Sequence, residues 1–194
     1  MAEASLSAPL PPGSTIGILG SGQLGRMLAM AAARLGLKTH IYCEESGPAF
    51  DVATHTTRAA FDDTAALTQF ASAVQAVTYE FENVPIATAQ HLAQLVPLRP
   101  SAKALEVAQD RLVEKEFISA LAIPVAPFRA VNSAAELSAA VAHFGAPAIL
   151  KTRRLGYDGK GQASVRPASK VQSGRISVQP CATHVSTPST QPKQ

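Results

Sequence analysis

Apolar positions recur with two different periods along the first part of the chain. Thr15–Leu19 is a short β-branched and apolar run that ends at a glycine, which is typical of a buried strand. Thr39–Tyr42 has the same character. Between them, apolar residues recur at helical spacing from Gln23 until Gly36 ends the helix. The apolar positions of this predicted helix are Leu24, Met27, Leu28, Ala31 and Leu35. Together these residues predict a βαβ unit with two parallel strands.

The alternation of strands and helices continues to about residue 100. The further predicted elements are a helix that Asp62 or Asp63 caps and that runs to Val74, a strand at Ala76–Tyr79, and a helix from Pro85 to Leu95. Repeated βα units pack most simply as a doubly wound parallel sheet. We therefore expect an α/β, Rossmann-like domain over residues 15–100, after a flexible leader at 1–14.

A second domain is predicted to begin near residue 101 and to remain incomplete at residue 162. A long helix is expected over 101–121. It is followed by a strand at Val125–Val131, a helix from the capping box Ser133–Glu136 to Phe144, and a strand at Ala148–Thr152. A glycine-rich turn at 153–162 completes this part of the chain.

The composition changes after Gln162. Residues 163–194 are rich in Ser, Thr, Pro and Gln and contain no acid, so we expect this segment to be disordered. It also accounts for all of the net positive charge of +3, because residues 1–162 alone have a net charge of −1. A near-neutral body without Trp argues against a nucleic-acid partner. No apolar run is long enough for a membrane helix, and two cysteines form neither a disulfide framework nor a metal site. These features predict a cytoplasmic protein.

The segment Gly20-Ser21-Gly22-Gln23-Leu24-Gly25 joins the first strand to the first helix. Glycines let the backbone approach a phosphate, and the helix N-terminus attracts its charge. Glu44 and Glu45 follow at the distance of a ribose-binding acid, which favours NAD. The phosphate of another ligand, or a tight turn without a ligand, fits the same glycines.

Two acids, Glu80 and Glu82, follow the strand Ala76–Tyr79. Ligands of open α/β sheets bind at this end of the strands. Both carboxylates lie on one side if the extended backbone continues, and they are otherwise part of a solvated loop.

The second domain contains two groups of cations. Arg111 and Lys115 are four residues apart on the predicted helix and can reach one anion, although a solvated helix face gives the same pattern. Lys151 precedes a turn, 153–162, with three glycines and further cations. Such a turn is suited to covering a polyphosphate, and its alternative interpretation is a basic surface turn.

Taken together, these four stretches resemble one enzyme family. GILGSGQLGRML, TYEFENVP, QDRLVEKEF and KTRRLGYDGKGQ occur in the order and with roughly the spacing of N5-carboxyaminoimidazole ribonucleotide synthase, and the resemblance covers about residues 14–162. It implies the ATP-grasp fold, with a Rossmann-like pre-ATP-grasp domain followed here by an incomplete ATP-grasp domain.

The resemblance also implies a set of ligand-binding residues. The ribonucleotide substrate would be held by Gly22, Gln23, Leu24 and Glu80. ATP would be held by Arg111, Lys151, Gly156, Tyr157, Asp158, Gly159, Lys160, Gly161 and Gln162. The implied cofactors are ATP and Mg²⁺. The family's magnesium-binding acids lie beyond the position of Gln162, so neither a metal ligand nor a catalytic residue is assigned in this chain.

The implied reaction is the carboxylation of 5-aminoimidazole ribonucleotide (AIR) in purine biosynthesis. ATP phosphorylates bicarbonate to carboxyphosphate, which then carboxylates the exocyclic amine of AIR. The implied partners are AIR, bicarbonate, ATP and a second copy in a homodimer. Because nothing after Gln162 resembles the family, we expect a truncated or frameshifted member without carboxylation activity.

Three alternatives to this family assignment fit some of the same residues. A related ATP-grasp enzyme uses formate and glycinamide ribonucleotide, but its glycine turn usually carries Glu and then Lys where this chain has Gln23 and Arg26. The others are an NAD-binding module and a domain that binds a phosphorylated ribonucleotide without catalysis.

Overall fold

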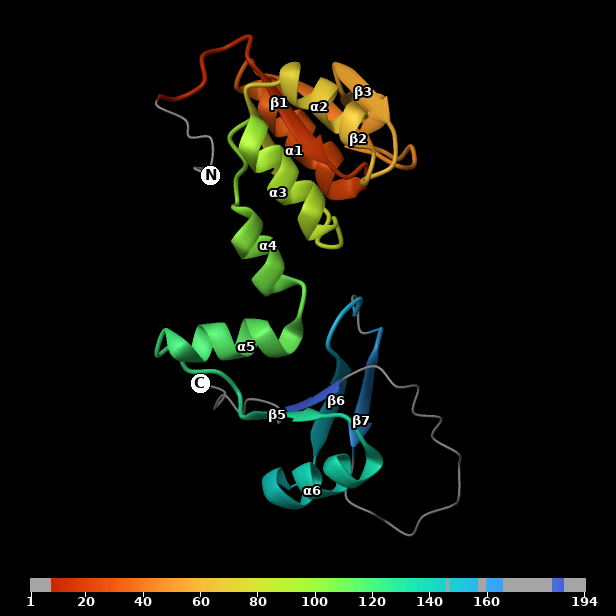
Figure 1. Cartoon of the computed structure of the whole chain (residues 1–194), viewed down its shortest axis with the longest axis vertical. Coiled ribbons are helices and arrows are strands. Elements are labelled where there is room, and N and C mark those ends of the chain that lie inside the picture. Colours follow the sequence, from red (N-terminus) through yellow and green to blue (C-terminus); the bar gives the residue numbers. More distant parts are fainter. Residues whose placement is uncertain (1–7, 146, 157–159, 166–182, 187–194) are drawn as a thin grey trace. The chain divides into compact units, whose positions relative to one another are not determined.

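The computed structural model describes residues 8–145, 147–156, 160–165 and 183–186. The chain forms two compact units, which divide between Glu106 and Val107. Figure 1 shows the helices and strands of both units. Within the described ranges, no helix combines the length and apolar character needed to cross a membrane.

The first unit contains a four-stranded sheet in the order β3-β2-β1-β4. Its strands are β1 (Thr15–Leu19), β2 (Lys38–Cys43), β3 (His55–Arg58) and β4 (Ala76–Tyr79). All three neighbouring pairs are parallel, and Ile18 of β1 lies opposite Ile41 of β2 and Thr78 of β4. The predicted parallel, Rossmann-like α/β sheet is therefore confirmed.

Helices lie between these strands and after the last of them. They are α1 (Gln23–Arg34), the short 3-10 helix η1 (Phe50–Val52), α2 (Thr64–Ser72), α3 (Ile86–Leu95) and α4 (Ala102–Ala108). Asp63 caps α2, as predicted, by accepting a hydrogen bond from the Ala66 N–H at 2.9 Å. Figure 1 shows α2 and α3 packed together beside the sheet.

The sheet has apolar side chains on both faces, because successive residues of a strand point to opposite sides. Leu19 and Tyr42 belong to the large core cluster that includes Phe70 of α2 and Leu92 of α3. Their neighbours along the strands, Ile18 and Ile41, belong to a separate small cluster with Ala49. Helices and loops therefore cover the sheet on both sides.

The apolar positions that predicted helix α1 do not form its buried face. Leu24 is 59% exposed and Leu35 is 70% exposed, and Met27, Leu28 and Ala31 are exposed as well. The buried residues of α1 are Gly25, Ala29 and Ala32. Helix and sheet approach closely at these small side chains, so the apolar spacing predicts the helix but does not identify its buried face.

Strand β3 was not predicted from the sequence. Its residues, His-Thr-Thr-Arg, are mostly exposed, and it forms an edge of the sheet. An edge strand is held by backbone hydrogen bonds to one neighbour, so it needs no apolar run to reveal it.

The helix predicted over 101–121 is divided into two, so that prediction is corrected. Helix α4 ends at Ala108, and α5 (Arg111–Ala120) begins after Asp110. The Asp110 carboxylate accepts hydrogen bonds from the N–H groups of Leu112 and Val113, which makes it the N-cap of a new helix. Leu105 of α4 belongs to the core of the first unit, a few residues beyond the expected domain boundary.

The second unit has a four-stranded antiparallel sheet in the order β5-β8-β6-β7. Its elements are α5, β5 (Phe128–Val131), α6 (Ala134–Phe144), β6 (Ala148–Thr152), β7 (Gln162–Val165) and β8 (Thr183–Ser186). The N-cap of α6 is Ser133, as predicted. The core cluster of the second unit is small, and its buried members are Val131, Ala140 and Ala148.

The prediction that all of 163–194 is disordered was wrong for two short segments of that range. Residues 163–165 extend β7, which pairs with β6, and residues 183–186 form β8, which pairs with β5 and β6. Backbone hydrogen bonds to neighbouring strands hold these strands in the sheet, and such bonds do not require an apolar sequence pattern. The remainder of 163–194, like residues 1–7, lies outside the described residues.

A candidate ribonucleotide and ATP site

The glycine turn and the end of β4 meet in the first unit. The backbone N–H of Gly22 donates a hydrogen bond of 2.8 Å to Glu80 Oε1, across 58 positions of sequence. The Glu80 N–H in turn donates to the Leu19 carbonyl oxygen at 3.0 Å. A carboxylate therefore lies at the N-terminus of α1, where free N–H groups and the helix dipole favour negative charge.

The glycines of this turn make room for Glu80. Gly20 has a φ of +111°, and a Cβ built there would lie 2.6 Å from Glu80 Oε1. At Gly22 the corresponding distance is 3.0 Å, and at Gly25 a Cβ would lie 3.0 Å from the Gly20 carbonyl oxygen. The turn is thus shaped around an acidic side chain as well as being open to a ligand.

Two other predicted substrate residues follow in the same turn. Gln23 is the first residue of α1, and both its side chain and that of Leu24 are exposed. Gly22, Gln23, Leu24 and Glu80 therefore lie together at one end of the sheet. Glu82 does not share their strand face, because β4 ends at Tyr79 and Glu82 lies in a turn.

The acid expected for NAD has another partner. Glu44 Oε1 accepts a hydrogen bond of 3.0 Å from the Phe61 N–H, and the Glu44 carbonyl oxygen accepts one from Arg58 Nε. Glu45 uses its carbonyl oxygen to accept a bond from Ser21 Oγ. Glu44 therefore holds a loop of the domain with its side chain, and Glu45 does so with its backbone.

Cations gather in the second unit. Burial is the larger cause of a lowered pKa at Lys115, and the positive charges of Arg111 and Lys151 lower it further, with Glu114 acting in the opposite direction. Arg111 and Lys151, two of the three cations predicted for ATP, therefore both lie near Lys115, although they lie on α5 and β6. Such a group favours binding of a polyphosphate.

Lys115 and Arg111 also have partners within the protein. Lys115 Nζ lies 3.4 Å from the Ala126 carbonyl oxygen and 5.3 Å from the centre of the Phe128 ring. Arg111 forms an exposed ion pair of 3.0 Å with Glu114. The idea that Arg111 and Lys115 reach one anion together finds no direct support in these contacts, because Lys115 is turned to Ala126 and Phe128.

The base of the glycine-rich turn is well defined. The Thr152 N–H donates to the Gly161 carbonyl oxygen at 2.7 Å, and Gly161 has a φ of +69°. A Cβ at Gly161 would overlap Thr152 Oγ1, and one at Gly156 would lie 3.0 Å from it. Lys160 and Gln162 complete the described part of the turn, while Tyr157, Asp158 and Gly159 lie outside the described residues.

Asp110 and Arg153 connect the two cationic segments, and the sequence analysis did not single them out as a pair. Arg153 donates two hydrogen bonds to the Asp110 carboxylate, Nε to Oδ1 at 3.0 Å and an Nη to Oδ2 at 2.5 Å. Burial alone would raise the pKa of Asp110, but these bonds, the two N-cap bonds and the Arg153 charge together hold it below its ordinary value. An Asp directly before a helical run is an N-cap signal that points to this position.

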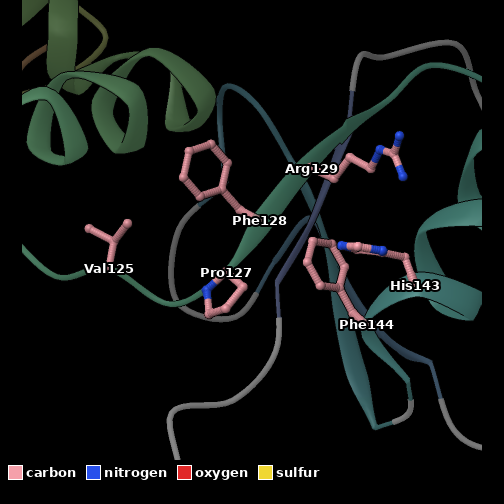
Figure 2. Close-up of a pocket in the computed structure, with 6 residues that line it drawn as sticks. All are labelled: Val125, Pro127, Phe128, Arg129, His143 and Phe144. Atoms are coloured by element: carbon pink, nitrogen blue, oxygen red, sulfur yellow. The ribbon is translucent and has the colours of Figure 1, made fainter.

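A cavity of about 530 Å³ lies elsewhere in the second unit, beside β5 and the end of α6 (Figure 2). None of the predicted site residues lines it. Its lining residues are Val125, Pro127, Phe128, Arg129, His143 and Phe144.

The donor set does not fit a metal site. Among the described residues, no three His, Cys, Asp or Glu side chains lie close enough together to hold one ion. We therefore assign no step of the chemistry to Mg²⁺.

Comparison with known proteins identifies the domains of the chain. The sequence matches the ribonucleotide synthetase preATP-grasp domain over residues 14–109 and the ATP-grasp domain over residues 116–183. The N5-carboxyaminoimidazole ribonucleotide synthase of Brucella melitensis biotype 1 is 50% identical over 165 residues, which are 84% of this chain and 46% of that protein.

Solved structures give the same result. The N5-carboxyaminoimidazole synthetase of Staphylococcus aureus complexed with ADP has a TM-score of 0.84 and 33% identity, covering 92% of this chain and 48% of its own. The synthase of Aspergillus clavatus in complex with ADP and AIR has a TM-score of 0.72 and 25% identity, with coverages of 90% and 46%. The chain thus spans about half the length of each of these relatives. It belongs to the N5-carboxyaminoimidazole ribonucleotide synthase family of ATP-grasp proteins.

Proposed function

We propose that this chain supplies the ribonucleotide-binding domain and the first part of the ATP-binding domain of an enzyme that carboxylates AIR. The reaction begins when bicarbonate oxygen attacks the γ-phosphorus of ATP, giving carboxyphosphate and ADP. The exocyclic amine of AIR then attacks the carboxyl carbon, phosphate leaves, and the amine loses one proton. The product is N5-carboxyaminoimidazole ribonucleotide.

The proposal that the first unit binds the ribonucleotide rests on the contact between Gly22 and Glu80. It brings a glycine turn, a helix N-terminus and an acid to one end of a parallel sheet, where such sheets bind their ligands. A carboxylate oxygen can accept more than one hydrogen bond, so Glu80 retains capacity for donors of AIR. Gln23 and Leu24 are exposed beside it.

The ATP half is supported by the cations of the second unit. Phosphoryl transfer depends mainly on positioning and on neutralising charge on the phosphoryl oxygens. Arg111 on α5 and Lys151 on β6 supply positive charge in one neighbourhood, next to the glycine-rich turn that Thr152 and Gly161 close. In this proposal both side chains bind the phosphates of ATP, together with Gly156–Gln162.

Three further features belong to the same proposal. Bicarbonate is the carboxyl donor, a second copy forms a homodimer, and the reaction takes place in the cytoplasm, where ATP is abundant. Sedimentation measurements on the purified chain, and cell fractionation, test the last two features.

Calorimetric titration of the 194-residue chain with AIR, ADP and NADH tests the ligands. We expect AIR and ADP to bind and NADH to fail. Glu80→Gln should weaken AIR about tenfold or more without changing ADP, and Lys151→Ala should do the reverse. Glu106→Gln and Lys103→Ala, which remove an exposed ion pair outside the site, are the matched controls. Binding of NADH, or equal AIR affinity in wild type and Glu80→Gln, contradicts the proposal.

A further inference from the structure

The most extensive side-chain connection in the second unit joins the start of α5 to the end of β6. Arg153 holds the Asp110 carboxylate with two hydrogen bonds, and the Arg111 N–H donates to the Arg153 carbonyl oxygen at 2.8 Å. Arg154, the residue after Arg153, donates to Oε1 of Gln109, the residue before Asp110, at 2.7 Å. We call Asp110 and Arg153 the clasp.

The clasp lies between the two groups that the proposed function assigns to ATP. Asp110 directly precedes Arg111, and Arg153 follows Lys151 by two positions. The same backbone also leads into the glycine-rich turn, because Thr152 pairs with Gly161. The contacts of Arg153 with Asp110 and Arg111 therefore join the segment that carries Lys151 to the start of α5.

The clasp has the properties of a rigid connection. An arginine that grips a carboxylate with two parallel bonds is fixed in direction as well as in distance. The Asp110 side chain is 13% exposed and that of Arg153 is 27% exposed, so water screens the pair much less than a surface pair. Asp110 is also the N-cap of α5, which fixes its own position on the helix.

We propose that Asp110 and Arg153 are positioning residues that hold the base of the glycine-rich turn against the start of α5, so that Arg111 and Lys151 present their charges to one nucleotide. This inference rests on the proposed function for the identity of the nucleotide. The structural part of the proposal, that the base of the turn loosens when the clasp is broken, does not depend on any ligand.

Asp110→Asn separates the clasp from the helix cap. Asparagine is as good an N-cap as aspartate, so α5 keeps its start, while the ion pair with Arg153 is lost. Arg153→Gln removes the charge from the other side, and Arg153→Lys restores the charge without the two-bond geometry. Glu106→Gln again serves as the control for loss of an ion-pair carboxylate.

Amide hydrogen exchange of the full chain measures whether the base of the turn loosens when the clasp is broken. We expect faster exchange in peptides covering 107–114 and 148–156 for Asp110→Asn and Arg153→Gln, an intermediate rate for Arg153→Lys, and no change for Glu106→Gln. Exchange in 15–100 should remain as in the wild type. Wild-type rates in both peptides for Asp110→Asn and Arg153→Gln would overturn the proposal.

ADP titration below the unfolding temperature of every variant measures the consequence for binding. We expect Asp110→Asn and Arg153→Gln to weaken ADP about threefold to tenfold, the range typical of coupling within one network of side chains, with partial recovery in Arg153→Lys. A role in folding alone would lower the unfolding midpoint but leave ADP affinity unchanged, and that result overturns the positioning role. If the wild-type chain fails to bind ADP, the proposed function is contradicted, while hydrogen exchange still decides whether the clasp holds the turn.

Discussion

Glu80 Oε1 accepts a hydrogen bond from the Gly22 N–H at 2.8 Å, and the same oxygen lies where a side chain on Gly20 would begin. The contact joins the two motifs that were predicted separately for the ribonucleotide, one at each of two neighbouring strands, β1 and β4. The glycines of the turn are therefore required by a partner within the protein, in addition to any phosphate that they admit. This relationship can be tested without a ligand.

Gly20→Ala should be much more destabilising than Gly13→Ala. Both glycines have positive φ, +111° and +90°, so alanine suffers a similar backbone penalty of about 1–2 kcal/mol at each. Only at Gly20 would the new Cβ meet Glu80, whereas nothing lies within 4 Å at Gly13. We expect a further loss of about 1–3 kcal/mol at Gly20, measured by urea unfolding. Equal losses would show that Glu80 moves away freely.

Glu80→Ala should destabilise the first unit more than Glu80→Gln. Alanine leaves the partly buried Gly22 N–H without its acceptor, at a cost of about 1–2 kcal/mol, while the glutamine carbonyl can replace the carboxylate oxygen. The comparison uses urea unfolding followed by circular dichroism. The same free energy of unfolding for Glu80→Ala and wild type would mean that the bond contributes nothing to the fold.

The strands were the most predictable part of the fold. The predicted bounds of Thr15–Leu19, Ala76–Tyr79 and Ala148–Thr152 agree with β1, β4 and β6, because each is a short apolar run with a clear end. Strand β3 was missed because an exposed edge strand carries no such run. The division between α4 and α5 was missed because helical spacing of apolar residues continues across Asp110.

The candidate site was predictable as a set of motifs but not as a set of contacts. Sequence order and spacing pointed to Gly22 and Glu80 individually, whereas their hydrogen bond depends on β1 and β4 being neighbours. The clasp is similar, since Asp110 and Arg153 are 43 positions apart and become partners through the packing of the second unit. Pairings of this kind follow from tertiary structure and leave no local pattern in the chain.

Leu28→Gln should leave stability within about 0.5 kcal/mol of the wild type, because the Leu28 side chain is 41% exposed on α1. Ala29→Leu, at the adjacent position, should cost about 1–3 kcal/mol, since Ala29 is 2% exposed and a larger side chain has no room there. Urea unfolding of the two variants decides which face of α1 is buried. The opposite order of stabilities would mean that the face carrying Leu28 is the buried one.

Lowering the pH should destabilise the first unit through His40. Burial is the larger cause that lowers the pKa of His40 below 6.5, and the neighbouring His55 adds to it. His40 lies in the sheet with one ring nitrogen 2.8 Å from Thr57 Oγ1 and its ring 4.9 Å from that of Phe70. The folded state therefore disfavours the proton that an unfolded chain accepts at its ordinary pKa.

The direction of the effect follows from this difference in proton binding. Above pH 6.5 His40 is neutral in both states, and its contribution does not depend on pH. As the pH falls below 6.5, the unfolded state binds a proton that the folded state does not, so stability decreases by up to about 1.4 kcal/mol per pH unit until the folded pKa is reached. Urea unfolding at several pH values should show a shallower decline for His40→Gln than for the wild type. An unchanged slope in His40→Gln would assign the acid sensitivity to other groups.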